Sequence, residues 1–180
     1  MKRKIFLNIS LLSIIWLICA TGSLSAQNRR IRTVDDLFSA YEQAKGVGYI
    51  SISPSLLKLA KAADDTKMDE VFNSIASLRI INIDIKAETN TIANQIRKDV
   101  ADLVKQGTFE EIVKMREDDS DFVIYLSQNK NKDNKQLEAL LMVANGKTEL
   151  VLIGISGKIT RTVIDAVMDG QIGILPKNPK

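Results

Sequence analysis

The fold is decided by one stretch near the carboxyl end, LEALLMVANGKTELVLIGIS at Leu137–Ser156. Two apolar runs in this stretch flank Asn145-Gly146-Lys147. Asn-Gly between apolar runs is the strongest local signal of a β-hairpin, because a type I′ turn needs positive φ at both central residues. We therefore predict a hairpin whose two-residue loop is Asn145 and Gly146, with Ala144 opposite Lys147.

This loop would fix which side chains share a face, since side chains alternate along a strand. One predicted face is almost wholly apolar and should meet the core: Ala139, Leu141, Val143, Thr148, Leu150 and Leu152. The other face is apolar in the middle and charged near its ends: Glu138, Leu140, Met142, Glu149, Val151 and Ile153. We expect central strands that helices cover on one face and partly on the other. Gly154 and Gly157 should end the second strand, at a bulge or a tight exit into the last helix.

Hydrophobic periodicity and capping residues place the other elements. Thr33, with Asp36 three residues later, should cap the first helix. A helix capped by Thr66 should carry a buried stripe that runs on through Ile75 and Leu78. The remaining predicted elements are helices from Pro54, over Asn90–Gln106 and over Lys158–Met168, and strands over Tyr49–Ser53, Arg79–Lys86, Phe109–Glu117 and Asp121–Gln128.

Four consecutive strands imply an antiparallel meander, so the predicted class is α+β. We expect a single domain over residues 33–170, with a largely antiparallel sheet and helices packed mainly on one face. Residues 27–32 are expected to form a flexible arm, and residues 171–180 a carboxyl-terminal tail. Ile172, Ile174 and Leu175 in that tail could add an edge strand or dock on the domain.

The first 26 residues have the layout of a secretory signal peptide. A basic start, Met1–Lys4, precedes the apolar run Ile5–Ala20, and a small-residue segment ends at Ala26. Cleavage after Ala26 would send the mature chain to the periplasm or outside the cell. Two alternatives are a retained membrane anchor and a lipoprotein attached through Cys19. Ile18 is a poor residue before a lipidated cysteine, so we expect Cys19 to be discarded with the signal segment.

Cleavage changes the charge of the chain. Removing Lys2, Arg3 and Lys4 leaves 22 basic residues against 22 acidic ones, so the precursor's excess of positive charge is not an argument for a nucleic-acid partner. The mature chain also loses its single cysteine, so a disulfide cannot stabilise it. Membrane contact is expected only through the signal segment before cleavage.

The absence of histidine from the sequence excludes several chemistries. Ser-His-Asp and Cys-His nucleophiles and ordinary zinc, copper or haem ligation are ruled out. Acidic clusters remain as candidates for a carboxylate pair or a calcium loop: Asp64-Asp65 with Asp69-Glu70, Glu117–Asp121, and the alternating segment Asn129–Asn134. We interpret these as helix junctions and solvated turns, and Tyr49 and Tyr125 as packing residues. No catalytic residue, cofactor or metal ion is therefore predicted.

The segment Leu150–Ile159, LVLIGISGKI, follows a glycine turn and precedes a short amphipathic helix. Together with Gly48–Pro54, GYISISP, and the signal segment, it resembles the domain-of-unknown-function family 4252. This is a family of small exported envelope proteins of Bacteroides-like bacteria. The resemblance spans roughly Val34 to Met168, implies an envelope location, and supplies no catalytic residue. Members often look like lipoproteins, and this chain departs from them because it lacks a good lipobox before Cys19.

Three functions are compatible with these observations. The first is a non-enzymatic envelope protein that binds another envelope protein through its sheet edges or through Ile172–Leu175. The second is a binder of an apolar small molecule or lipid, held between sheet and helices. The third is a carboxylate-dependent hydrolase built on Asp64 and Asp65.

Overall fold

The computed structural model describes residues 31–59, 66–117, 119–128 and 137–168, all within the compact unit Ile31–Lys180. Ala26, the predicted cleavage site, and Cys19 lie outside the described residues. The described helices are α2 (Val34–Tyr41), α3 (Pro54–Leu59), α4 (Thr66–Ser74), α5 (Asn90–Lys105) and α6 (Arg161–Met168). The described strands are β1 (Gly48–Ile52), β2 (Ile75–Asp84), β3 (Phe109–Glu117), β4 (Ser120–Gln128), β5 (Leu137–Gly146) and β6 (Glu149–Gly157).

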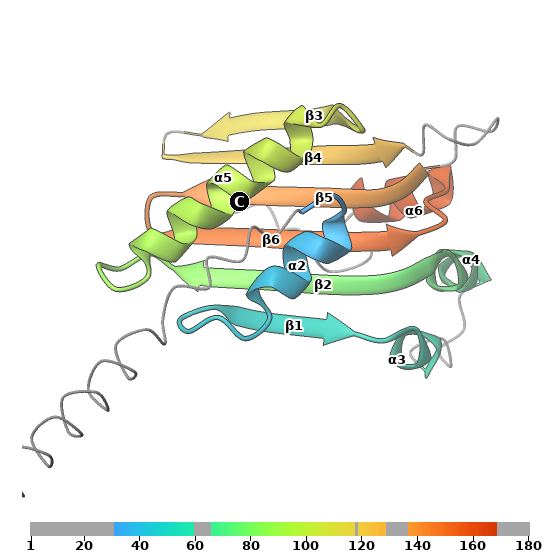
Figure 1. The fold of residues 1–180 in the computed structure, drawn as a ribbon. Helices are drawn as coiled ribbons and strands as arrows, with labels where there is room; N and C mark the ends of the chain where they lie inside the picture. Colours follow the sequence, from blue (N-terminus) through green and yellow to red (C-terminus); the bar gives the residue numbers. More distant parts are fainter. Residues whose placement is uncertain (1–30, 60–65, 118, 129–136, 169–180) are drawn as a thin grey trace, which may run out of the picture. The chain divides into compact units, whose positions relative to one another are not determined.

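The strands form one antiparallel sheet with the order β1-β2-β6-β5-β4-β3 (Figure 1). The predicted α+β class is confirmed, and β3 to β6 form the expected meander. β2 adds beside β6, although about sixty residues separate them in the chain, and β1 closes that side. β1 and β3 are therefore the edge strands among the described residues.

Helix α2 begins as its sequence predicts. The Thr33 hydroxyl accepts a hydrogen bond from Asp36 N at 3.0 Å, and Asp36 Oδ2 accepts one from Thr33 N at 3.1 Å. This reciprocal pair satisfies two amide groups that a helix start leaves free. Asp35 then links the helix to the sheet. Its Oδ1 lies 2.8 Å from Arg79 Nη1 in β2 and accepts hydrogen bonds from the hydroxyl groups of Ser77 in β2 and Ser156 in β6.

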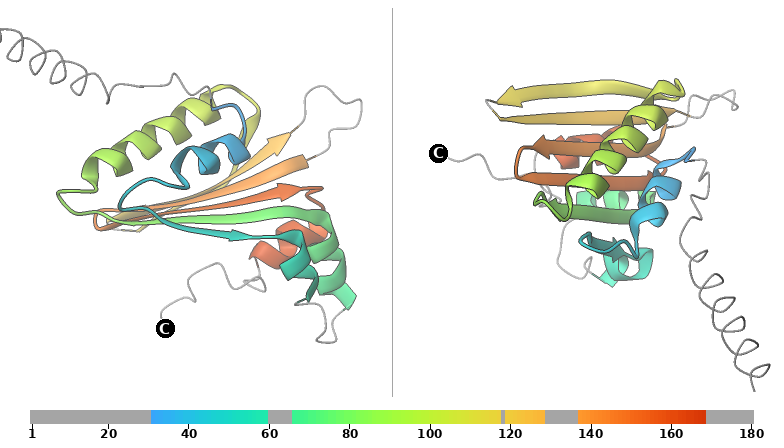
Figure 2. Two further views of the ribbon diagram at one scale, coloured as in Figure 1. Left: turned by 60° about the horizontal axis from the view of Figure 1, so that its bottom comes forward. Right: turned by 60° about the vertical axis from the view of Figure 1, so that its left-hand side comes forward.

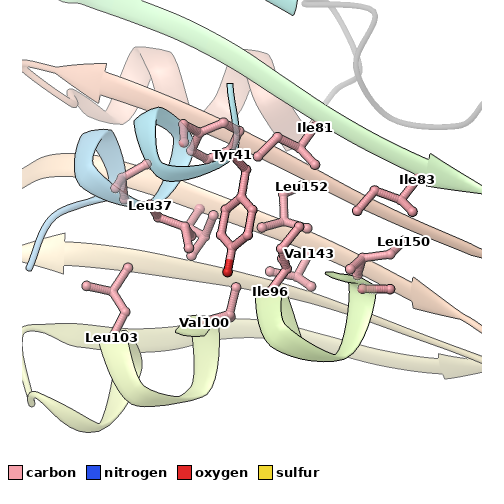
Figure 3. Packing of buried hydrophobic residues seen from close by; sticks show 14 of the residues in the cluster. Leu37, Tyr41, Ile81, Ile83, Ile96, Val100, Leu103, Val143, Leu150 and Leu152 are labelled. Atoms are coloured by element: carbon pink, nitrogen blue, oxygen red, sulfur yellow. The ribbon is translucent and has the colours of Figure 1, made fainter. Parts of the chain in front are cut away.

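Two apolar clusters lie on opposite faces of the sheet. One is enclosed by α2 and α5, and Figure 3 shows the side chains of Leu37, Ile96 and Leu103 meeting Leu150 and Leu152 from the strands. The other is enclosed by α3, α4 and α6, which gather at one end of the opposite face (Figure 2). The expectation that helices lie mainly on one face is therefore wrong. The second face also needs cover, because Leu140, Met142, Ile153 and Ile155 make it apolar.

The β5–β6 hairpin forms in a different register from the predicted one. Asn145 pairs with Leu150 and Val143 with Leu152, so Lys147-Thr148 is the loop. Asn145 and Gly146 instead extend β5 and pair with β4. Gly146 is not among the described glycines with positive φ, which a type I′ loop at this position would require. Each β5 residue lies opposite a β6 residue four positions further along the chain than predicted. Because four is an even number, the predicted division of side chains between the two faces holds.

The two glycines predicted to end β6 have separate places in the structure. Gly157 ends the strand with φ +144°, and a Cβ there would collide with the Ser74 carbonyl oxygen. Gly154 lies inside the strand, so the prediction that it ends the strand is wrong. It is buried beneath α2, and a Cβ there would lie 2.6 Å from Phe38 Cε2. The absence of a side chain at Gly154 therefore allows α2 to pack closely on the sheet.

The boundary between α4 and β2 also differs from the prediction. Ile75 and Leu78 belong to β2 and not to a helical stripe, and β2 ends at Asp84. Apolar residues at 71, 72, 75 and 78 fit a helical period, yet Ile75 is paired with Gly157 across the sheet. Pairing with β6 therefore extends this strand beyond what local periodicity indicates.

Candidate functional site

A polar cleft lies beside the first half of α5, at the end of the sheet where β3 ends, β4 begins and β5 ends. Its volume is about 420 Å³. The side chains of Arg97, Arg116, Asp119, Asp121 and Lys147 line it. Helix α5 positions Arg97 at the cleft, because Ile96 and Val100 on the same helix are buried against the sheet and fix its orientation. The sequence offered no motif for this cleft, since its residues come from separate elements.

Arg97 connects α5 to the end of β5. Its Nε donates to Asn145 Oδ1 at 2.7 Å, its Nη2 donates to the Gly146 carbonyl at 3.2 Å, and its Nη1 donates to Asn94 Oδ1 at 2.8 Å. These bonds hold Asn145 and Gly146 in strand conformation. The predicted turn residues therefore line the cleft, and Arg97 gives the physical reason why they are not the loop.

The rim of the cleft is charged but balanced. Arg116 Nε lies 2.6 Å from Asp121 Oδ1, and Lys147 forms an ion pair with Asp119. The hydrogen bond between Arg116 and Asp121 raises the pKa of Arg116 and lowers the pKa of Asp121. Arg116 and Lys147 thus each have a carboxylate partner, so these two pairs add little net charge to the cleft.

A smaller cavity of about 230 Å³ continues beneath α5. Its apolar lining comes from both the helix and the sheet: Ile96, Val100, Ala101, Val123, Tyr125, Val143 and Leu150. Burial raises the pKa of Tyr125, with a smaller contribution from the negative charge of Glu111. Tyr125 and Tyr49 both pack against the cluster under α2 and α5, as predicted from their strand positions.

Of the predicted acidic clusters, the structure describes only parts. Asp64, Asp65, Asp118 and the segment 129–134 lie outside the described residues. Glu70 accepts a hydrogen bond from the Thr162 hydroxyl at 3.2 Å, which ties α4 to α6. Within the described ranges, no three Asp or Glu side chains are close enough to hold a metal ion. Asp119 and Asp121 instead pair with the basic residues of the cleft rim.

The two edge strands differ sharply in charge. β3 carries five charged residues, and its pairing with β4 is interrupted by an irregularity between Glu111 and Val113. Charges and bulges of this kind prevent an edge from pairing with another chain. β1, with the sequence GYISI, has neither protection. Ile50 in β1 is 54% exposed, and no described strand lies beyond it.

Comparison with known protein families identifies the family of this chain. A family model for a domain of unknown function, DUF4252, matches residues 41–167. The chain belongs to this family. The resemblance inferred from the hairpin and from Gly48–Pro54 is thereby confirmed, and the family's description names no activity. The match covers every described strand and every described helix except part of α2 and the last residue of α6.

Comparisons with curated proteins and with solved structures do not indicate a function. No curated protein matches the chain. The crystal structure of PA94, a protein of unknown function from Pseudomonas aeruginosa, is 8% identical over 74% of this chain and 84% of that chain, with a TM-score of 0.33. The solution structure of the PsbP protein of Synechocystis sp. PCC 6803 is 16% identical over 71% and 84%, with a TM-score of 0.32. Scores this low support no argument about function.

Across the described ranges, none of the helices combines the length and the hydrophobicity needed to cross a bilayer.

Proposed function

We propose that this protein is an exported cell-envelope protein that acts without catalysis, by binding an extended segment of another protein along β1. The uncharged edge of β1 carries the proposal. An edge strand presents unpaired N–H and C=O groups, and a partner segment can add to the sheet through main-chain hydrogen bonds. Export is supported by the signal-peptide layout of the first 26 residues.

The chemistry of the edge indicates the class of partner. Ile50 and Ile52 face the side of the sheet shared with α3, α4 and α6, since Ile50 pairs with Ile80 and Ile52 with Leu78. Tyr49 and Ser51 face the other side. A partner strand would place alternate side chains beside these two rows. An extended segment with apolar residues at every second position fits β1, whereas a highly charged segment does not.

Site-specific photo-crosslinking in the producing cells tests the interaction. A photoreactive residue at Ser51 in β1 should yield a discrete crosslinked partner. The matched control carries the same residue at Lys114, which lies in the charged edge strand β3. Equal crosslinking from both positions, or none from Ser51, would count against β1 as the contact edge.

Cell fractionation with N-terminal sequencing tests export separately. The proposal predicts a mature protein in the envelope or the medium whose first residue is Gln27. An intact Met1 on the mature protein would contradict it.

A second candidate function is favoured by the cavity beneath α5. The apolar part of its lining suits part of an apolar small molecule or lipid held between sheet and helix, and the charged residues Arg97, Lys114, Arg116 and Asp121 also line it. Its volume of about 230 Å³ is below the roughly 300–1,000 Å³ of typical ligand pockets, which is why this candidate ranks second.

Mass spectrometry of organic extracts from the purified protein tests this candidate. An Ala101→Trp variant should fill the cavity and lose any bound compound. An Asp102→Trp control, one residue along the helix and outside the cavity lining, should retain it. An extract without a stoichiometric compound would remove this candidate.

A further inference from the structure

Part of one sheet face is apolar and has no helix over it among the described residues. Helices α3, α4 and α6 gather at the end of the sheet where β1 and β6 finish (Figures 1 and 2). The cross-strand pairs place one apolar residue from each strand in a row: Ile50, Ile80, Ile153, Met142, Ile124 and Val113. The middle of this row, Ile153, Met142 and Ile124, is buried in the cluster that the helices enclose, whereas Ile50 at the β1 edge is exposed. The next row continues the face with Asn82, Val151, Ala144, Phe122 and Met115. We call this second row, together with the exposed Ile50, the open apolar face.

The exposure of this face is unusual. Ile50 is 54% exposed and Met115 is 53% exposed, at opposite edges of the sheet. Ile80, Val151 and Phe122 between them are partly buried. An antiparallel sheet can turn one face to water, but the water-facing positions are then mostly polar. A row of partly exposed apolar side chains that crosses several strands is an interaction site by its chemistry.

The chain itself supplies a segment of suitable length and chemistry. Helix α6 packs on this same side of the sheet through Val163, Ala166 and Val167, and it ends at Met168. Twelve residues follow, with the sequence DGQIGILPKNPK, and they lie outside the described residues. The apolar residues of this segment are Ile172, Ile174 and Leu175.

The distances are compatible with docking. An eight-residue helix such as α6 is about 12 Å long, whereas a nine-residue strand such as β6 is roughly 30 Å long. About 18 Å of the face therefore extends beyond the helix. An extended chain covers about 3.3 Å per residue, so residues 172–175 can lie roughly 13–23 Å from Met168.

Charge complementarity favours the same segment. Asp84 pairs directly with Glu149 across β2 and β6, at the far end of the open apolar face. Two carboxylates in this arrangement repel each other unless a cation lies nearby. Lys86 lies 3.7 Å from Asp84, and Asn82 donates to Glu149 at 3.2 Å. Lys177 follows the apolar residues of the segment by two positions, so the segment would bring a second cation to this end.

We infer that residues 171–177 of the same chain dock on the open apolar face, with Ile172 and Ile174 against the sheet and Lys177 near Asp84 and Glu149. The segment completes the second hydrophobic layer that α3, α4 and α6 begin. This inference goes beyond the proposed function, because it assigns a surface to the chain's own carboxyl-terminal segment and is independent of the partner at β1.

Methyl-resolved NMR on the isotope-labelled protein tests the inference. We expect nuclear Overhauser contacts from the methyl groups of Ile172 or Ile174 to those of Ile50, Val151 or Met115. A sample that mixes labelled with unlabelled protein distinguishes contacts within one chain from contacts between two copies. Contacts only between copies would assign the face to a second molecule and overturn the inference, and so would their complete absence.

Two variants complete the test. The double change Ile172→Ser and Ile174→Ser should abolish these contacts, shift the Met115 methyl resonance and increase the binding of an apolar dye. The matched control, Gln171→Ser with Asn178→Ser, should leave all three unchanged. An unshifted Met115 resonance in the isoleucine variant would also overturn the inference. Crosslinking at Ser51 is a separate readout, so failure of either proposal can be recognised without the other.

Discussion

Replacing Gly154 by alanine should destabilise the protein, and the structure indicates by how much. The new Cβ would lie 2.6 Å from Phe38 Cε2 and 2.8 Å from Val34 Cγ1. Carbon atoms in contact prefer about 3.5–4.0 Å, so α2 would have to withdraw by roughly 1 Å. Phe38 is fully buried and Val34 is 3% exposed, so neither side chain can turn into solvent.

Two effects oppose each other in this variant. Overpacking of a filled core costs about 1–3 kcal/mol. Alanine recovers about 0.4–1 kcal/mol because it restricts the unfolded chain more than glycine does. The collision outweighs this gain, so Gly154→Ala should lower the free energy of unfolding by about 1–2 kcal/mol.

Urea denaturation followed by circular dichroism measures this effect. The midpoint should fall with an unchanged m-value, since the surface exposed on unfolding stays the same. The thermal midpoint should fall by roughly 2–8 °C, at about 2–4 °C for each kcal/mol in a chain of this size. Lys98→Ala, at an exposed position of α5, is the control and should change stability by less than about 0.5 kcal/mol.

A double variant makes the test specific to the contact. Combining Gly154→Ala with Phe38→Leu, which removes the ring that the new Cβ meets, should cost less than the sum of the two single changes. Additive costs, or a Gly154→Ala protein as stable as the wild type, would refute the account of how α2 packs on β6.

Three further predictions concern the cleft and the cavity beneath α5. Arg97→Ala should lower the free energy of unfolding by about 1–2 kcal/mol in urea denaturation, because its three hydrogen bonds, two of them to the end of β5, are lost; a cost equal to that of the exposed control Lys98→Ala would contradict this. Asp121→Asn should reduce the loss in free energy of unfolding that the wild-type protein shows as the pH falls below about 4. Because the folded-state pKa of Asp121 is lowered by Arg116, its contribution is present above the unfolded pKa of about 3.9 and is lost as pH falls through the folded value; an identical acid limb in the variant would contradict this. Tyr125→Phe should remove a component that ionises above the ordinary tyrosine range in the spectrophotometric titration, because burial raises the pKa of Tyr125; an unchanged titration curve in that range would contradict this. That raised pKa gives stability that is present below pH about 10 and is lost as pH rises through the folded value.

Elements with a strong local pattern could be predicted from the sequence. Helix α5 was expected over Asn90–Gln106 and occupies Asn90–Lys105, because its apolar stripe, including Ile96 and Val100, is a helical repeat. The strand β3 has the predicted bounds, and β4 begins one residue early. The Thr33 cap is likewise a local interaction that its two residues determine.

Features that depend on distant neighbours could not be predicted. Asn145-Gly146 has the composition of a type I′ loop, yet Arg97 and the pairing with β4 hold both residues in a strand. Ile75 fits a helical stripe and is a strand residue because β6 pairs with it. In each case a contact between residues far apart in the chain prevails over a local preference.

The candidate sites show the same division. Acidic runs are visible in the sequence, but the cleft joins residues of α5, β3, β4 and β5 that no linear motif connects. The contrast between β1 and β3 can be recognised in their sequences once both are known to be edges. Strand order was the missing information, because the meander alone did not reveal where β1 and β2 would add.

Amide hydrogen exchange is the most direct test of the central claim that β1 is a docking edge. The measurement compares the protein alone with the protein bound to a synthetic segment of the partner crosslinked at Ser51. The account predicts slower exchange for those amides of Gly48–Ile52 that point away from β2, with exchange in β3 unchanged. Unchanged exchange in β1, or protection of β3 instead, would contradict it.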